Sequence, residues 1–304
     1  MRPVPGALAV YVGRFQPPHA GHLLTMQAAL DRHGRLLVLL GSANLARSSR
    51  NPFTPRERAA MLRAALPGAG GTARRVALAA VPDEFDAARW AAHVRAAVRS
   101  ARPAGEVILI GFDKDASSSY LHWFPEWTLD PAPPVQAAGR LLNATDLREQ
   151  YLGGGVVPSA LPPAVGTFLT GFQGTRAYRH LRAEHAALRA ERAAWSGEPR
   201  HERLDLYAAP HAGEPAVWLT RRAGPIGAGL WALPGTPLNP GDRPAGASVF
   251  AHPGRSLGVP TTAHVVRAPA PPPGTQPVPL ARALARPRRF FEDHHVILTR
   301  LTAH

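Results

Sequence analysis

The feature that most constrains this chain is a short apolar run at residues 7–12, which leads directly into a turn rich in glycine and proline. The turn reads Gly13-Arg-Phe-Gln-Pro-Pro-His-Ala-Gly-His22, and a helical pattern follows it. We therefore expect a buried strand, a tight loop and a helix N-terminus in succession. The first N–H groups of a helix lack internal partners and carry about half a positive charge, so this arrangement favours phosphate binding.

Two histidines lie where this helix should begin. His19 and His22 are three residues apart, so we expect both side chains on one face. Two imidazoles that face one phosphate can donate hydrogen bonds to the charge that develops on it in a transition state. Gly13 and Gly21 have no side chain and let the backbone approach a ligand closely. The alternative is a turn whose histidines only cap the helix.

The ten-residue segment resembles the His-x-Gly-His motif of the nucleotidyltransferase superfamily, in the form found in nicotinamide mononucleotide adenylyltransferases. The resemblance implies transfer of the adenylyl group of ATP to nicotinamide mononucleotide, which yields NAD and pyrophosphate. It places His22 at the reacting α-phosphate, and His19 and Arg148 at the β- and γ-phosphates, as catalytic residues. The implied ATP-binding residues are Gly13, Arg14, Phe15, His19, His22, Asn143, Thr145 and Arg148. Mg²⁺ would be bound mainly through the ATP phosphates, and no metal site made of protein side chains is expected.

The composition is compatible with a nucleotide-binding protein. The 304 residues carry a net charge of +14, which favours polyanionic ligands such as nucleotides, or nucleic acid without sequence specificity. A general bias towards Arg, Ala, Gly and Pro explains the same charge equally well. The sequence contains no Cys, which excludes disulfides and thiolate metal sites, and it has no apolar stretch of membrane-spanning length. We expect a cytoplasmic protein with no membrane contact and no specific nucleic-acid partner; a homo-oligomer stays open.

Strand and helix patterns alternate up to about residue 140. Continuous apolar runs at 36–40, 76–81 and 107–110 suit parallel strands that are covered on both faces, and a fifth strand is expected near 134–138. Helical stretches are expected at 21–32, 55–66 and 86–101, and again over 161–195. This order predicts an α/β fold with a Rossmann-like parallel sheet, whose ligands bind beyond the C-terminal ends of the strands.

The loop after the second strand is polar and cationic. Thr54 and Glu57 have the spacing of a capping box at a helix start, which we prefer to a ligand role for them. The segment from Gly41 to Arg58 resembles the corresponding loop of the same adenylyltransferases, which lines the substrate phosphates. The resemblance makes Arg47 a candidate phosphate ligand, with Arg50 as the alternative.

The acceptor nucleotide is expected at an aromatic cluster. Trp90 lies at the start of the third helix, and its two alternatives are core packing and the role that the resemblance implies, stacking on a cationic pyridinium ring. The block from Gly111 to Trp127 is similar to a segment of bacterial family members that contacts nicotinamide mononucleotide. The implied acceptor-binding residues are Arg47, Asn51, Trp90, Lys114, Asp115, Ser118, Tyr120, Phe124 and Trp127.

A second phosphate site is expected near residue 145. Asn143 or Thr145 can cap a short helix with Arg148 in its first turn. The segment resembles the superfamily's second motif, Ile-Ser-Ser-x-x-x-Arg. It is persuasive because it follows the first motif in the expected order.

A smaller domain follows a composition shift at 196–203. We expect an adenylyltransferase domain over 1–195, a linker over 196–203, and a truncated Nudix-like α+β domain over 204–304, with strands at 204–208 and 216–221. Residues 229–242 resemble the entry to a Nudix motif, but Arg243-Pro-Ala-Gly-Ala-Ser248 replaces its glutamate-rich helix, and the proline-rich stretch 269–279 should lack an ordered core. We therefore expect no hydrolysis of nucleoside diphosphate derivatives. The domain would be a structural remnant, a module that binds ligands of the ADP-ribose type, or an oligomer contact.

Several alternatives stay open at this stage. Glu292, Asp293, His294 and His295 suit a helix start better than a metal site. Another phosphorylated acceptor, such as nicotinate mononucleotide or phosphopantetheine, would keep the histidine motif. A regulatory protein that binds nucleotide or nucleic acid without catalysis would draw on the positive charge.

Overall fold

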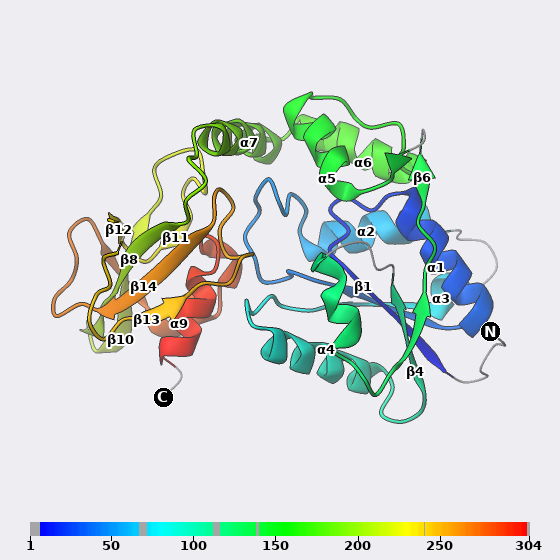
Figure 1. The fold of residues 1–304 in the computed structure, drawn as a ribbon, viewed down its shortest axis with the longest axis horizontal. Coiled ribbons are helices and arrows are strands. Elements are labelled where there is room, and N and C mark those ends of the chain that lie inside the picture. Colours follow the sequence, from blue (N-terminus) through cyan, green and yellow to red (C-terminus); the bar gives the residue numbers. More distant parts are fainter. Residues whose placement is uncertain (1–6, 67–71, 112–115, 138–139, 240, 303–304) are drawn as a thin grey trace. The chain divides into compact units, whose positions relative to one another are not determined.

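The computed structural model describes residues 7–66, 72–111, 116–137, 140–239 and 241–302. Contacts divide the chain into two compact units, drawn in Figure 1. The first comprises Met1–Ala43 and Ser49–Arg179, and the second comprises Asn44–Ser48 and His180–His304. The division falls within helix α7 (Arg176–Ala193). The domain boundaries expected from composition stay a prediction.

The first unit is built on a five-stranded parallel sheet with the strand order β3-β2-β1-β4-β5. The strands are β1 (Leu8–Gly13), β2 (Leu36–Leu40), β3 (Val76–Ala80), β4 (Val107–Gly111) and β5 (Thr128–Pro131). In the centre of the sheet, Val10 of β1 pairs with Leu37 on one side and Leu109 on the other. The Rossmann-like parallel sheet predicted from the alternating pattern is confirmed.

Both faces of this sheet are buried, which explains the continuous apolar runs. Ala9, Val38 and Ile108 pack into a core on one face, whereas Val10 and Leu39 pack into a core on the other. The helices expected from the sequence are present as α1 (Ala20–His33), α2 (Pro55–Ala65) and α4 (Ala87–Ala101). A short helix, α3 (Thr72–Arg75), and a 3₁₀ segment, η1 (Ala116–His122), complete this part.

The predicted position of the fifth strand was wrong. β5 occupies 128–131, whereas residues 136–137 and 140–141 form a small antiparallel pair, β6 (Gln136–Ala137) and β7 (Arg140–Leu141). β5 lacks the continuous apolar run that marks the other strands, because it carries a buried carboxylate, Asp130. That carboxylate accepts hydrogen bonds from His33 and Arg32 at 2.8 Å each, and so it can lie inside the sheet.

The helical character expected over 161–195 is present, but it is interrupted. The region forms two helices, α6 (Pro163–Gln173) and α7, with a break at Gly174 and Thr175. The hydroxyl of Thr175 accepts a hydrogen bond from the N–H of Tyr178 at 3.1 Å, and so caps the second helix. Before them, α5 (Ala144–Arg148) continues into a π-helical turn, η2 (Glu149–Gly153).

The second unit contains two four-stranded sheets and short helices. One sheet has the order β12-β8-β14-β13, and the other has the order β11-β10-β15 with β9 paired to β10. The strands are β8 (Arg200–Leu206), β9 (Ala208–His211), β10 (Glu214–Arg221), β11 (Trp231–Ala232), β12 (Gly235–Leu238), β13 (Ser248–Phe250), β14 (Thr261–Arg267) and β15 (Gln276–Pro279). Helices α8 (Leu280–Leu284) and α9 (His294–Thr302) and the 3₁₀ turn η3 (Pro287–Arg289) follow. This is the α+β architecture expected from the sequence.

Two details of the second unit differ from expectation. The strand expected at 204–208 is two strands, because β8 ends at Leu206 and β9 begins at Ala208. The proline-rich stretch does contribute to the core: β15 pairs with β10, and its Val278 is 9% exposed. Prolines are tolerated there because β15 is an edge strand, where a missing N–H breaks no ladder. No helix within the described ranges has the length and apolar character needed to span a bilayer.

Candidate functional site

Two stacked imidazoles stand at the N-terminus of α1. The rings of His19 and His22 lie 3.6 Å apart between centroids at 27°, and the backbone N–H of His19 donates to Nδ1 of His22 at 3.2 Å. Gly21 permits this packing, because a Cβ there would lie 3.1 Å from the His19 ring. The expectation that both histidines share one face is confirmed. Their proposed contacts with ATP stay a prediction.

The loop between β1 and α1 is folded around Phe15. Its φ of 51° is in the left-handed region, and its side chain is 1% exposed, packed edge-on against Tyr11 and His22. A Cβ at Gly13 would lie 2.9 Å from the Phe15 ring, so this position needs glycine. Any contact of Phe15 with ATP would therefore be made by its main chain, because its ring is buried in the protein.

Gln16 ties this loop to the start of α2. Its side-chain amide donates to the carbonyl oxygen of Phe53 and accepts from the N–H of Phe53, both at 2.9 Å. The carbonyl oxygen of Gln16 accepts a hydrogen bond from Nη1 of Arg148 at 2.8 Å. Nη2 of Arg148 donates to the hydroxyl of Thr145 at 3.2 Å. The two nucleotide motifs predicted from the sequence are thus in direct contact, and Gln16, which sequence analysis missed, joins them to a third segment.

Arg148 belongs to a group of arginines at the C-terminal end of the sheet. It is 8% exposed, and burial together with the charges of Arg14 and Arg50 lowers its pKa to about 9. Mutual repulsion of this kind favours the binding of a multiply charged anion. Arg148 ends α5, so its expected place in the first turn was wrong. Asn143 is the cap, and its side-chain oxygen accepts from the N–H of Asp146 at 2.9 Å.

Of the two candidate arginines in the loop after β2, Arg50 belongs to the first unit. Its positive charge contributes to the lowered pKa of Arg148. Arg47 lies in the segment Asn44–Ser48, which groups with the second unit, and its role stays a prediction. Asn51 is 5% exposed. The capping box is confirmed, because Thr54 Oγ1 accepts from the N–H of Glu57 at 3.3 Å and Glu57 accepts from the N–H of Thr54 at 2.7 Å.

Aromatic residues gather where the acceptor was expected. Trp90 packs edge-on against Tyr120 and Trp123, with centroids 5.7 and 5.6 Å apart, and Phe124 stacks on Trp127 at 4.3 Å. The Tyr120 hydroxyl donates to the carbonyl oxygen of Val12 at 3.3 Å, which ties this cluster to the end of β1.

These aromatic rings also contribute to the core of the first unit. Phe124 is 2% exposed, whereas Trp90 is only partly buried and retains surface for a ligand. Trp123 was missed by sequence analysis. Lys114 and Asp115 lie outside the described residues, as does the side chain of Ser118.

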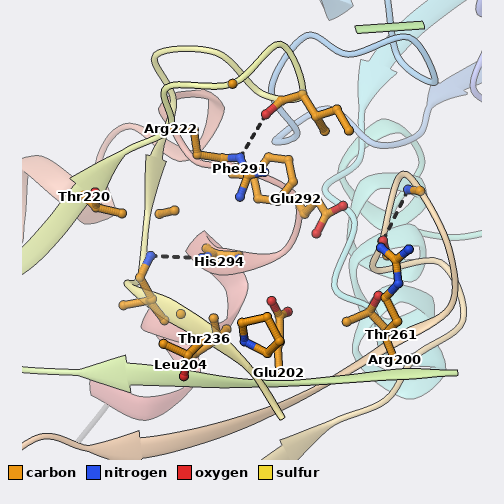
Figure 2. Close-up of a pocket in the computed structure, with 18 of the residues that line it drawn as sticks. Arg200, Glu202, Leu204, Thr220, Arg222, Thr236, Thr261, Phe291, Glu292 and His294 are labelled. Carbon is orange, nitrogen blue, oxygen red and sulfur yellow. Dashed lines mark hydrogen bonds between the residues drawn. The ribbon is translucent and has the colours of Figure 1, made fainter. Parts of the chain in front are cut away.

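The second unit contains a cavity of about 480 Å³. Figure 2 shows Glu202 of β8, and Phe291 and Glu292 before α9, among the residues that line it. The Arg222 guanidinium lies 3.7 Å from the centroid of the Phe291 ring. The Nδ1 atom of His294 accepts a hydrogen bond from the N–H of Leu233 at 2.9 Å. This bond anchors the start of α9 to the residue that follows β11.

One guanidinium pairs with two carboxylates beside this cavity. Arg255 donates to both oxygens of Asp293 at 2.9 and 3.0 Å, and to Glu202 at 3.0 Å. Burial and the charges of Asp293 and Glu202 raise the pKa of Glu292 to about 8, although a 2.6 Å hydrogen bond from the N–H of Leu257 and the charge of Arg255 lower it.

The segment 292–295 behaves as a helix start, as predicted, since α9 begins at His294 and the Asp293 carbonyl accepts from the N–H of Ile297. Within the described ranges, no group of three or more acidic, histidine or cysteine side chains could hold a metal ion.

Comparison with known proteins agrees with the geometry of the first unit. Residues 10–76 match the cytidylyltransferase-like family model. Over 179 residues, the chain is 34% identical to a nicotinamide/nicotinic acid mononucleotide adenylyltransferase from Acinetobacter baylyi, which covers 59% of this chain and 93% of the relative. The chain belongs to the nicotinamide mononucleotide adenylyltransferase family. A nicotinamide-nucleotide adenylyltransferase from Thermococcus kodakarensis is 28% identical over 172 residues, covering 57% of this chain and 87% of that relative.

The fold of this adenylyltransferase-family chain extends beyond the region shared with those relatives. A bifunctional NMN adenylyltransferase/ADP ribose pyrophosphatase from Francisella tularensis, crystallised with AMP and a manganese ion, matches with a TM-score of 0.85. The match covers 98% of both chains at 23% sequence identity, so it establishes the fold. The fold expected from the sequence, a Rossmann-like nucleotidyltransferase domain followed by a smaller α+β domain, is therefore confirmed.

Proposed function

We propose that the first unit transfers the adenylyl group of ATP to nicotinamide mononucleotide, forming NAD and pyrophosphate. The observation that carries this proposal is the stacked His19–His22 pair beside Arg148, Arg14 and Arg50 at one end of a parallel sheet. Such a group of donors and positive charges suits a triphosphate and the charge that develops during its cleavage. The 34% identity to the Acinetobacter enzyme over most of that enzyme's length supports the same reaction.

The reaction needs positioning and charge stabilisation more than proton transfer. An oxygen of the acceptor's phosphate attacks the α-phosphorus of ATP, the bond from that phosphorus to the bridging oxygen breaks, and pyrophosphate departs with the electron pair. A phosphate dianion is already ionised at neutral pH, so no general base is required. In this proposal His22 donates to the α-phosphate, while His19 and Arg148 bind the β- and γ-phosphates. Arg148 stays largely protonated at neutral pH, because its pKa is about 9.

Magnesium fits this site as a ligand of the nucleotide. The positive charges of Arg14, Arg50 and Arg148 at this end of the sheet repel a free cation but tolerate one that arrives bound to a triphosphate. When bound, Mg²⁺ would neutralise part of the phosphate charge and favour pyrophosphate departure. The protein's contribution in this proposal is to hold the phosphates with His19, His22 and Arg148.

The acceptor is proposed to bind against the aromatic cluster. Trp90 is only partly buried, and an indole face attracts a cationic pyridinium ring. The amide and acid forms of the mononucleotide both carry this ring, so nicotinate mononucleotide is the alternative acceptor. Comparison of the two in parallel reactions decides between them.

The test is an assay of the full chain with ATP, Mg²⁺ and either mononucleotide, in which dinucleotide formation is followed by chromatography. We expect dinucleotide from the wild-type chain and a loss of about 100-fold in kcat for His22→Ala, as is typical when a donor to the developing charge is removed. His93→Ala, on the exposed side of α4, is the matched control and should retain wild-type turnover. Full turnover by His22→Ala would contradict the role given to that histidine.

We also propose that the second unit does not hydrolyse nucleoside diphosphate derivatives. Two observations support this: residues 241–247 connect β12 to β13 without a helix, and Arg255 already engages Glu202 and Asp293. Metal-assisted hydrolysis needs carboxylates that are free to hold the ion. Incubation of the chain with ADP-ribose and Mg²⁺ or Mn²⁺ should release no AMP. Release of AMP that scales with protein concentration would contradict the proposal.

A further inference from the structure

A buried arginine, for which the described residues supply no carboxylate partner, lies beneath the proposed triphosphate site. Arg58 of α2 is 0% exposed. Its Nη1 donates to the carbonyl oxygens of Arg14 at 2.6 Å and Gly41 at 2.8 Å. Its Nε and Nη2 atoms have no hydrogen-bond partner in the part of the chain that the structure describes. Burial of a guanidinium under these conditions is strongly unfavourable, so a purely structural position would be better filled by an apolar side chain.

The two carbonyls that Arg58 binds lie at the ends of the central strand β1 and its neighbour β2. Arg14 follows β1 and Gly41 follows β2, and the N–H of Gly41 donates to the carbonyl oxygen of Gly13 at 2.9 Å. The histidine loop leaves the sheet at this point. A carbonyl oxygen repels a phosphate, so a guanidinium that binds these oxygens both fixes the loop and removes an unfavourable charge from beneath the ligand.

Arg58 also adds to the positive charge of this region. Burial, together with the charge of Arg14, lowers the pKa of Arg58 to about 10. Arg14 in turn acts on Arg148, as does Arg50. Four guanidinium groups therefore oppose one another at the end of the sheet. A triphosphate among them would relieve this repulsion, which links anion binding to the stability of the first unit.

We propose that Arg58 is a positioning residue for adenylyl transfer, which holds the Arg14 and Gly41 carbonyls and supplies a buried positive charge to the bound triphosphate. This inference rests on the proposed function of the first unit. The role differs from the phosphate binding proposed for His19, His22 and Arg148, because Arg58 is fully covered by protein and acts through the loop and through its charge.

The experiment compares Arg58→Met and Arg58→Lys with the wild-type chain. Arg56→Met, two residues earlier on the exposed side of the same helix, is the matched control. Each variant is measured for kcat, for KM of ATP, and for its thermal midpoint with and without inorganic triphosphate. These readouts separate a positioning role from a structural one.

Arg58→Met should raise the KM for ATP by about tenfold and lower kcat, because charge-assisted hydrogen bonds and a favourable charge are lost. Without ligand its thermal midpoint should equal or exceed that of the wild type, since a buried charge is removed, whereas its stabilisation by triphosphate should be smaller. Arg58→Lys keeps the charge and should show a smaller rise in KM. Arg56→Met should match the wild type.

The inference is overturned if Arg58→Met lowers the midpoint but keeps wild-type kcat, KM and triphosphate stabilisation, as a structural role requires. If Arg58→Met does not fold, Arg58→Lys decides: an unchanged KM for ATP overturns the inference. Absence of dinucleotide with the wild-type chain would contradict the proposed function instead. In that case the response of the midpoint to inorganic triphosphate still reports on Arg58.

Discussion

The ion pair between Arg255 and Asp293 allows a quantitative prediction for the second unit. The two side chains are 1% and 2% exposed and are joined by two hydrogen bonds. Removal of one partner from such a pair leaves an uncompensated buried charge and typically costs about 3–5 kcal/mol. Arg255 would still contact Glu202, whose side chain is 28% exposed, so we place Asp293→Asn near the lower end, at about 3 kcal/mol.

Removal of both charges should be less harmful. Arg255→Met combined with Asp293→Leu replaces the pair by apolar groups of similar size, and we expect it to cost less than either single change. The surface pair of Arg203 and Asp205, with side chains 42% and 20% exposed, is the control. Asp205→Asn should change stability by less than about 1 kcal/mol.

The measurement must report on the second unit alone, because a chain with two units need not unfold in one step. Urea unfolding followed by hydrogen exchange of peptides from β8 and α9 gives this resolution. Asp293→Asn with a stability within about 0.5 kcal/mol of the wild type would refute the reasoning, as would a double variant less stable than both single ones.

Four further predictions concern single residues. Glu292 has a raised pKa of about 8, so the folded state keeps a proton that the unfolded state loses, and wild-type stability should fall as pH rises from about 4.5 to about 8. Glu292→Gln should flatten this fall in thermal midpoints measured across that range, and an unchanged slope would contradict the assignment. Trp90→Ala should raise the KM of the mononucleotide by about tenfold in the dinucleotide assay, with Trp90→Phe in between; equal KM values would remove the stacking role. Tyr151→Phe should cost about 1 kcal/mol in urea unfolding, because the hydroxyl donates to the Leu169 carbonyl at 2.7 Å, and no loss would refute this. Thr54→Ala should cost about 1 kcal/mol through loss of the capping box, whereas Thr54→Ser should restore stability.

The parallel sheet could be predicted because its central strands are apolar on both faces. Leu36–Leu40 is buried throughout, and such a run has few alternatives in an α/β pattern. β5 could not be found in this way, since Asp130 depends on His33 and Arg32, which come from a distant helix. The break before α7 depends on the cap formed by Thr175. The periodic pattern of arginine and alanine in this region gives no sign of that cap.

The candidate site shows the same division between local and distant information. The spacing of His19 and His22 predicts their shared face, and the second motif identifies Arg148 but not its contact with Gln16. Gln16 and Arg58 were missed because each acts on backbone atoms 17 to 44 residues away. A hydrogen bond to a carbonyl oxygen has no sequence pattern of its own, so the side chain that donates it can be identified only in the folded chain.

Arg255 has a consequence for how the second unit responds to its surroundings. A positive charge that is covalently part of the chain cannot be diluted, exchanged or removed by a chelator. Asp293 and Glu202 therefore keep a cationic partner at every magnesium concentration. Under the proposal that this unit does not hydrolyse nucleoside diphosphate derivatives, metal binding beside the cavity would require removal of this arginine as well as an added acidic helix, because the built-in cation would otherwise compete with any ion that entered.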